Sequence, residues 1–144
     1  MTLAELIADS ARQLSNAGVH FGQGTLNAMD EAAWLVLWQL GLPLDTAVDE
    51  ATAPLPAEQV LAARALIARR IESRQPAAYL TGEAWLQGVP FHIDARSIIP
   101  RSLIAEVLAE GYLDEWLPPG APRIMDLCTG NGSLAVLAAM AWPE

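Results

Sequence analysis

Apolar residues recur at intervals of three and four along the first 75 positions, and this spacing predicts three helices. The first is expected directly after Thr2, because Thr2 and Glu5 form a capping-box sequence. The second is expected over about 27–41, and the third from Pro56 to just before Pro76. Their predicted apolar stripes are Leu3, Leu6, Ile7 and Leu14; Met29, Ala33, Leu37 and Leu40; and Val60, Ala63, Ile67 and Ile71.

Arginines of the third predicted helix fall mostly off its apolar stripe. The group comprises Arg64, Arg69, Arg70 and Arg74. A helix places its charged residues opposite the face that packs on the core. We therefore expect these arginines on a solvated face.

The period of the apolar positions changes in the next part of the chain. Alternation over 89–93 predicts strands, and Gln87-Gly88 suits the turn of a β-hairpin between them. Pro100 blocks further extension. Ser102 is a suitable N-cap, so another helix is expected from there to about Trp116.

The last part of the chain predicts a strand, a loop and a helix after a stiff linker at Pro118–Pro122. The apolar segment Arg123–Cys128 is expected in the middle of a parallel sheet, buried on both faces. An apolar helix follows from Ser133 to Trp142. Because the sequence ends twelve residues after the loop, we expect disorder beyond about Pro118, or self-association through the Arg123–Cys128 strand.

The loop between this strand and helix has the composition of a nucleotide-type cofactor site. Glycines let a ligand approach the backbone, and the helix N-terminus carries a positive partial charge. Gly130, Gly132 and Ala135 also satisfy a dinucleotide pattern, so the glycines leave a nicotinamide enzyme open. Asp126, just ahead of the loop, would repel a pyrophosphate. A ligand with a cationic end fits better, such as the α-ammonium of S-adenosyl-L-methionine.

Charge and composition narrow the function classes. The chain has 17 acidic residues against 8 basic ones, a net charge of −9, which argues against a sequence-specific nucleic-acid surface. Cys128 is the single cysteine, and His20 and His92 stand apart, so neither a disulfide nor a metal site is expected. No apolar run is long enough to span a bilayer, and we expect a cytoplasmic protein without membrane contact.

The segment Asp126–Gly132 resembles the first motif of seven-strand S-adenosylmethionine methyltransferases, which reads Asp/Glu-x-Gly-x-Gly-x-Gly. Cys128 stands where glycine is usual. The resemblance implies that the cofactor is bound by Asp126, Cys128, Thr129, Gly130, Asn131 and Gly132. Asp126 would contact the ammonium group of the cofactor.

Three further segments, Arg74–Gly82, Phe91–Asp94 and Ile98–Ser102, resemble the protein-(glutamine-N5) methyltransferases of the HemK/PrmB type. This resemblance implies a helical substrate-recognition domain over 1–76 and a β-hairpin linker over 77–100. The start of a Rossmann-like methyltransferase domain would follow over 101–144, with only its first βα unit in this chain. Pro100 and Arg101 would shape the site where the hairpin meets that domain.

Ser102 stands where release-factor enzymes of the family usually have proline. With Phe21–Thr25 and Leu42–Asp45, it makes the chain more similar to the PrmB branch. That branch implies methylation of a glutamine amide in the third protein of the large ribosomal subunit. The alternative substrate is a release factor. The alternative to a solvated face for the arginines of the third helix is that they contact ribosomal RNA.

The family fixes the glutamine amide with an Asn-Pro-Pro-Tyr motif, and this chain contains none. No catalytic residue is therefore assigned here, and we expect weak or no cofactor binding and no activity from this chain alone. The alternative function is a non-catalytic module that binds a ribosomal or release-factor partner.

Overall fold

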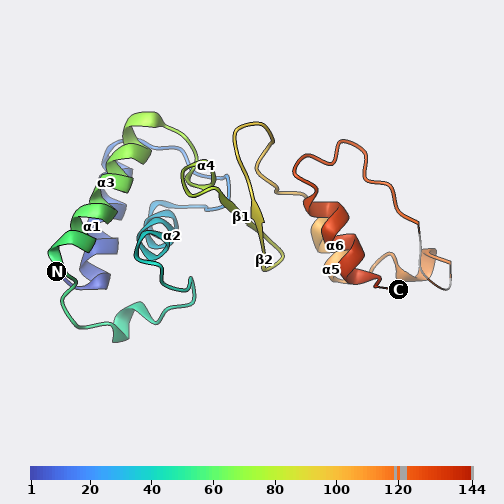
Figure 1. Ribbon diagram of the computed structural model, residues 1–144, viewed down its shortest axis with the longest axis horizontal. Coiled ribbons are helices and arrows are strands. Elements are labelled where there is room, and N and C mark those ends of the chain that lie inside the picture. Colours follow the sequence, from blue (N-terminus) through green and yellow to red (C-terminus); the bar gives the residue numbers. More distant parts are fainter. Residues whose placement is uncertain (119, 121–122, 144) are drawn as a thin grey trace. The chain divides into compact units, whose positions relative to one another are not determined.

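The computed structural model describes residues 1–118, 120 and 123–143. The chain divides into two compact units, Met1–Thr81 and Gly82–Glu144 (Figure 1). The predicted domain boundaries at residues 76 and 100 stay predictions. The predicted linker lies in part outside the described residues, because it includes positions 119, 121 and 122. No helix within the described residues has the length and apolar character needed to cross a membrane.

The first unit is helical. It contains α1 (Leu3–Asn16), α2 (Ala28–Leu40), the 3-10 helix η1 (Val48–Glu50), α3 (Ala57–Ser73) and the short α4 (Ala77–Thr81). Helices α1, α2 and α3 contact one another, and α4 packs on α2 (Figure 1). The helical character predicted for residues 1–76 is confirmed, whereas α4 lies in the segment predicted as a β-hairpin linker.

Local capping explains where these helices begin and end. Glu5 N donates to Thr2 Oγ1 at 3.3 Å and Thr2 N donates to Glu5 Oε2 at 2.8 Å, so the predicted capping box is present. Asn27 Oδ1 accepts from the backbone N of Asp30 at the start of α2. Gly41 closes α2 with a φ of +66°, a conformation that costs glycine little.

The core of the first unit lies between its three long helices. Its largest fully buried side chains include Leu3, Leu6, Leu14, Leu35, Val36 and Ile67. Each such burial stabilises the fold by roughly 1.5–3 kcal/mol relative to an exposed side chain. The stripe predicted for α2 is wrong at Met29, which is 51% exposed. Four consecutive residues, Trp34–Leu37, are buried instead, because neighbouring helices cover α2 on more than one side.

The arginine face predicted for α3 is also wrong in part. Arg70 is 3% exposed and forms an ion pair with Glu31 of α2. Arg69 and Arg74 are exposed as expected, and the Arg74 guanidinium donates to the backbone oxygen of Ala17. The physical reason is that Glu31 is buried too, so a cation close to α2 is required to offset its charge.

The second unit begins with an antiparallel hairpin of β1 (Glu83–Leu86) and β2 (Val89–His92). Glu83 pairs with His92 and Leu86 with Val89, so the turn lies at Gln87-Gly88 as predicted. The hairpin is followed by α5 (Ile104–Ala109), the 3-10 helix η2 (Asp114–Trp116) and α6 (Ser133–Ala141). The helix predicted from Ser133 is confirmed.

Two predictions for this unit are wrong. The helix expected to reach about Trp116 stops at Ala109, because Gly111 adopts a φ of +69° that breaks the helical path. The segment Arg123–Cys128 is not a strand. A strand requires a hydrogen-bonding neighbour, and the sheet among the described residues consists of β1 and β2. Ile124, Met125 and Leu127 are correspondingly 48%, 80% and 79% exposed.

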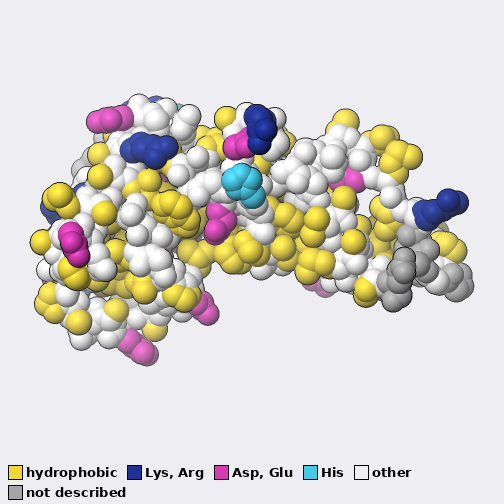
Figure 2. Space-filling model, in the orientation of Figure 1, with side chains coloured by type: hydrophobic (Ala, Val, Ile, Leu, Met, Phe, Trp, Pro, Cys, Tyr) yellow, Lys and Arg dark blue, Asp and Glu magenta, His cyan; other side chains and the backbone are white. Residues whose placement is uncertain are grey.

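The core of the second unit is small. Ala105 and Leu108 of α5 and Leu137 and Ala138 of α6 are buried together. Partly buried residues from the hairpin, from α6 and from the segments that follow α5 and α6 pack around them: Leu86, Val89, Phe91, Leu113, Leu134 and Trp142. In Figure 2, hydrophobic side chains reach the surface over this part of the chain. Packing against α5 and the hairpin thus holds α6, and with it the loop that precedes α6, in a defined position.

Candidate functional site

The loop Asp126–Gly132 leads directly into α6. Thr129 Oγ1 donates to Asp126 Oδ2 at 2.9 Å, and Gly132 N donates to the backbone oxygen of Thr129 at 2.9 Å. Asp126 is half-buried, whereas Cys128 and Thr129 are exposed. The loop therefore folds back on itself, and the hydrogen bond from the Thr129 hydroxyl holds the Asp126 carboxylate in place.

Three residues of the loop adopt left-handed backbone conformations. Cys128 has a φ of +61°, Gly130 of +60° and Gly132 of +85°. A left-handed conformation costs a residue with a Cβ roughly 1–2 kcal/mol. This conformation gives a physical reason why the motif that the loop resembles usually has glycine at the Cys128 position.

The backbone of the loop is open to an approaching ligand. A Cβ built on Gly132 would meet no atom within 4 Å, and one on Gly130 would meet only Ile98 Cγ2, at 3.9 Å, among the described residues. Gly132 is also the N-cap of α6 and has no side chain to cap the helix, although the Asn131 side chain accepts from one first-turn donor, Ser133 N. The first-turn N–H groups of a helix have no intrahelical partner and attract anionic groups.

Asn131 connects the loop to neighbouring elements. Its Nδ2 donates to the backbone oxygen of His92 at 3.4 Å, and its Oδ1 accepts from Ser133 N at 3.3 Å. The side chain predicted as a cofactor contact therefore also ties the end of β2 to the start of α6.

The segment between β2 and α5 reaches the same loop through Ile98. Arg96 makes a bidentate contact with Asp94, with Nε 3.0 Å from both carboxylate oxygens and a terminal nitrogen 2.7 Å from Oδ2. The hydrogen bonds from the Arg96 side chain lower the pKa of Asp94 from 3.8 to about 2. This turn positions the residues that follow, and Ile98 comes to lie close to Gly130.

Pro100 is half-buried and Arg101 is exposed. Ser102 was predicted as the N-cap of α5, but Leu103 holds that position. The Ser102 Oγ instead accepts from Ile104 N at 3.2 Å.

Ile98 was not predicted as a site residue. Nothing in the apolar pattern separates it from Ile99, yet Ile98 is 67% exposed and Ile99 is 3% exposed.

An apolar cavity of about 370 Å³ is lined in part by Asp126. Its lining includes Ile104, Leu113, Met125, Leu134 and Trp142. No group of three or more His, Cys, Asp or Glu side chains in the described part of the chain is arranged to hold a metal ion. The arrangement is one carboxylate, an open glycine-containing loop and a helix N-terminus, which suits a small ligand with a cationic and an anionic group.

The PrmC N-terminal domain family matches residues 5–82 of this chain. The chain belongs to that family. The PrmC N-terminal domain match ends close to the boundary between the two compact units, so the Asp126–Gly132 loop lies beyond it.

Similarity to longer proteins extends through both units. The chain is 50% identical over 147 residues to the ribosomal protein uL3 glutamine methyltransferase of Bordetella pertussis, covering 99% of this chain and 48% of that protein. It is 44% identical over 146 residues to the protein of that name from Burkholderia pseudomallei, covering 99% and 47%. For the Xanthomonas campestris protein the identity is 43% over 136 residues, covering 94% and 44%.

The chain therefore spans about half the length of the curated relatives it matches. The family predicted from Arg74–Gly82, Ile98–Ser102 and Asp126–Gly132 is confirmed. The assignment of individual cofactor contacts to the loop stays a prediction.

Proposed function

We propose that this PrmC-family chain forms part of a methyltransferase that uses S-adenosylmethionine to methylate a glutamine side chain of the ribosomal protein uL3. The observation that carries the proposal is the 50% identity to a uL3 glutamine methyltransferase over 99% of the chain, which takes in both the helical unit and the Asp126–Gly132 loop. With a ribosomal protein as substrate, the activity is assigned to the cytoplasm.

The residues of the loop fit this cofactor. The methionine part of S-adenosylmethionine carries an ammonium and a carboxylate. Asp126 supplies a negative charge for the ammonium, and the N-terminus of α6 supplies N–H groups and positive partial charge for the carboxylate. The open backbone at Gly130 and Gly132 leaves room for the ligand to approach.

When bound, S-adenosylmethionine supplies an electrophilic methyl group on a sulfonium centre. The contribution of this chain is to bind and orient: Asp126 and the α6 N-terminus fix one end of the ligand, and Asn131 ties the loop to the end of β2. Orientation of reacting groups accounts for a large share of the rate in such transfers. The unit 82–144 is assigned as the start of a Rossmann-like methyltransferase domain.

The test uses a chimera in which this chain replaces the matching half of the Bordetella pertussis relative. Methyl transfer from radiolabelled S-adenosylmethionine to large-subunit ribosomal proteins is measured, and the modified residue is located by mass spectrometry. We expect a methylated glutamine in uL3. Asp126→Asn is expected to lower the activity by a factor of about ten or more, in line with the loss of a charge-assisted contact.

Glu110→Gln is the matched control, since Glu110 is an exposed acid outside the loop, and it is expected to keep full activity. Activity on a release factor but not on uL3 would overturn the substrate. Unchanged activity of the Asp126→Asn chimera would overturn the cofactor site. Stabilisation of the chimera by NAD and not by S-adenosylmethionine would replace the methyl donor with a nicotinamide cofactor.

A further inference from the structure

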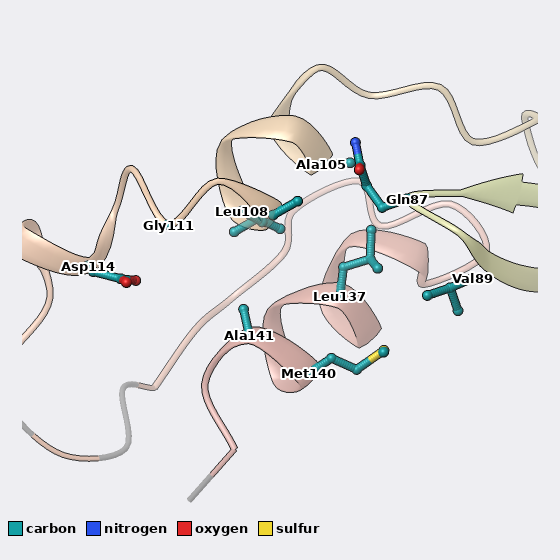
Figure 3. Close-up of a pocket in the computed structure, with 10 residues that line it drawn as sticks. Gln87, Val89, Ala105, Leu108, Gly111, Asp114, Leu137, Met140 and Ala141 are labelled. Atoms are coloured by element: carbon teal, nitrogen blue, oxygen red, sulfur yellow. The ribbon is translucent and has the colours of Figure 1, made fainter.

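A second hollow in the unit 82–144 is a groove of about 320 Å³ between the hairpin turn, α5 and α6. Figure 3 shows Asp114 at one end and Gln87, Leu137 and Val89 toward the other, with Leu108 and Ala141 between them. Its volume lies at the lower end of the range for ligand sites, roughly 300–1,000 Å³. The groove shares one lining residue, Leu108, with the cavity beside Asp126, and its lining contains no residue of the loop Asp126–Gly132. The groove is therefore separate from that loop.

The carboxylate at the end of this groove is held in a defined position. Trp142 Nε1 donates to Asp114 Oδ1 at 2.9 Å, and Asp114 N donates to the backbone oxygen of Gly111 at 3.1 Å. A Cβ on Gly111 would lie 3.0 Å from Asp114 Oδ2, closer than side chains normally pack. Glycine at this position therefore leaves the space that the carboxylate occupies, and the φ of +69° at Gly111 favours glycine for the same turn.

The charge of Asp114 is not balanced by a cation among the described residues. The ion pairs there involve Glu5, Asp9, Glu31 and Asp94 as the acids. The groove is lined by no Arg or His side chain. An ionised carboxylate has about four acceptor sites, and the single indole N–H of Trp142 fills one of them.

We propose that this groove binds an arginine or lysine side chain of a basic protein partner. The aliphatic stem of such a side chain covers the apolar walls formed by Leu108, Leu137 and Ala141, while its cationic head reaches Asp114. A purely apolar ligand would desolvate the carboxylate without compensation, and an anion would be repelled by it. The net charge of −9 also favours encounter with a basic protein.

Two blocked peptides test the proposal with the chain as it stands. They are acetyl-Leu-Arg-Leu-amide and the same peptide with citrulline, a neutral analogue of arginine of nearly equal shape. NMR titration follows the indole N–H of Trp142 and the methyl groups of Leu137 and Met140. We expect the arginine peptide to shift these signals and to bind about fivefold more tightly than the citrulline peptide at low salt, with the difference removed near 1 M NaCl.

Asp114→Asn keeps an acceptor for the Trp142 indole and removes the charge, so it is expected to bind both peptides equally. Glu115→Gln is the matched control, because Glu115 is the adjacent acid in η2 and does not line the groove, and it is expected to keep the preference. Equal binding of the two peptides by the wild-type chain would overturn the proposal, whether or not Asp114→Asn folds. A retained preference in Asp114→Asn would do the same. Shifts of these signals with protein concentration in the absence of peptide would assign the groove to a second copy of the chain instead.

Discussion

Arg70 Nε donates to Glu31 Oε1 at 2.8 Å, and each side chain is 3% exposed. The pair joins α3 to α2 across 39 positions of sequence. Arg70 also donates to the backbone oxygen of His20 at 3.0 Å, and Thr25 Oγ1 donates to Glu31 Oε2 at 2.9 Å. The network thus holds His20 and Thr25, two positions inside the loop between α1 and α2, which has no regular secondary structure.

Removing one partner of this pair is expected to be costly. Arg70→Met leaves the Glu31 carboxylate buried without its cation and should lower the free energy of unfolding by about 3–5 kcal/mol. Urea unfolding measures the change. The double variant Glu31→Leu with Arg70→Met should lose less, because no charge is then left buried. The control Arg69→Met alters an exposed neighbour and should change stability by less than about 0.5 kcal/mol. An equal loss in the Arg69 and Arg70 variants would contradict the argument.

Leu35 tests the core of the helical unit. It is 0% exposed, and Leu35→Ala should lower the free energy of unfolding by about 2–5 kcal/mol through lost burial and the cavity that remains. Leu61→Ala is the matched control, because Leu61 lies on α3 and is 72% exposed. Guanidinium unfolding compares the two variants. A loss at position 61 as large as that at position 35 would show that the core is misplaced.

The contact between Arg96 and Asp94 predicts a pH dependence. Hydrogen bonds from Arg96 hold the pKa of Asp94 at about 2 instead of 3.8 in the folded chain. The folded pKa is lowered, so the stabilisation is present above about pH 4 and is lost as the pH falls toward 2. Carboxyl NMR titration should give a midpoint near 2 for Asp94, and Arg96→Ala should return it toward 3.8. Arg12→Ala, in the other compact unit, should leave the midpoint unchanged.

Cys128 tests the strain in the loop before α6. Its φ of +61° disfavours a β-branched residue, so Cys128→Val should destabilise the unit 82–144 by about 1–2 kcal/mol relative to Cys128→Gly. Hydrogen exchange at the Val136 amide, which donates to the backbone oxygen of Gly132, reports the change. Ala139→Val on the exposed side of α6 is the control and should cost less than about 0.7 kcal/mol. Greater protection in Cys128→Val than in Cys128→Gly would be inconsistent with a left-handed residue 128.

Local signals in the sequence predicted several elements well. The Thr2–Glu5 capping box, the Gln87-Gly88 turn and the helix from Ser133 all appear where the pattern indicates. Each depends on groups only a few positions apart, so a short stretch of chain contains the whole cause. In the loop Asp126–Gly132, the glycine turns and the hydrogen bond between Asp126 and Thr129 likewise depend on residues that are close together in the sequence. The helix after Ser102 was predicted too long because the left-handed turn at Gly111 outweighed the apolar spacing.

Features that depend on distant partners were not predictable in this way. Ile98 and Ile99 are identical in type, and only their surroundings expose one and bury the other. Arg123–Cys128 has the composition of a strand, but a strand is stable only beside another strand. The sequence alone determined the helical character of the first 76 residues, the hairpin turn and the family. The tertiary structure decided that Glu31 and Arg70 are buried together and which side chains surround Asp114, because burial depends on groups brought together from separate parts of the chain.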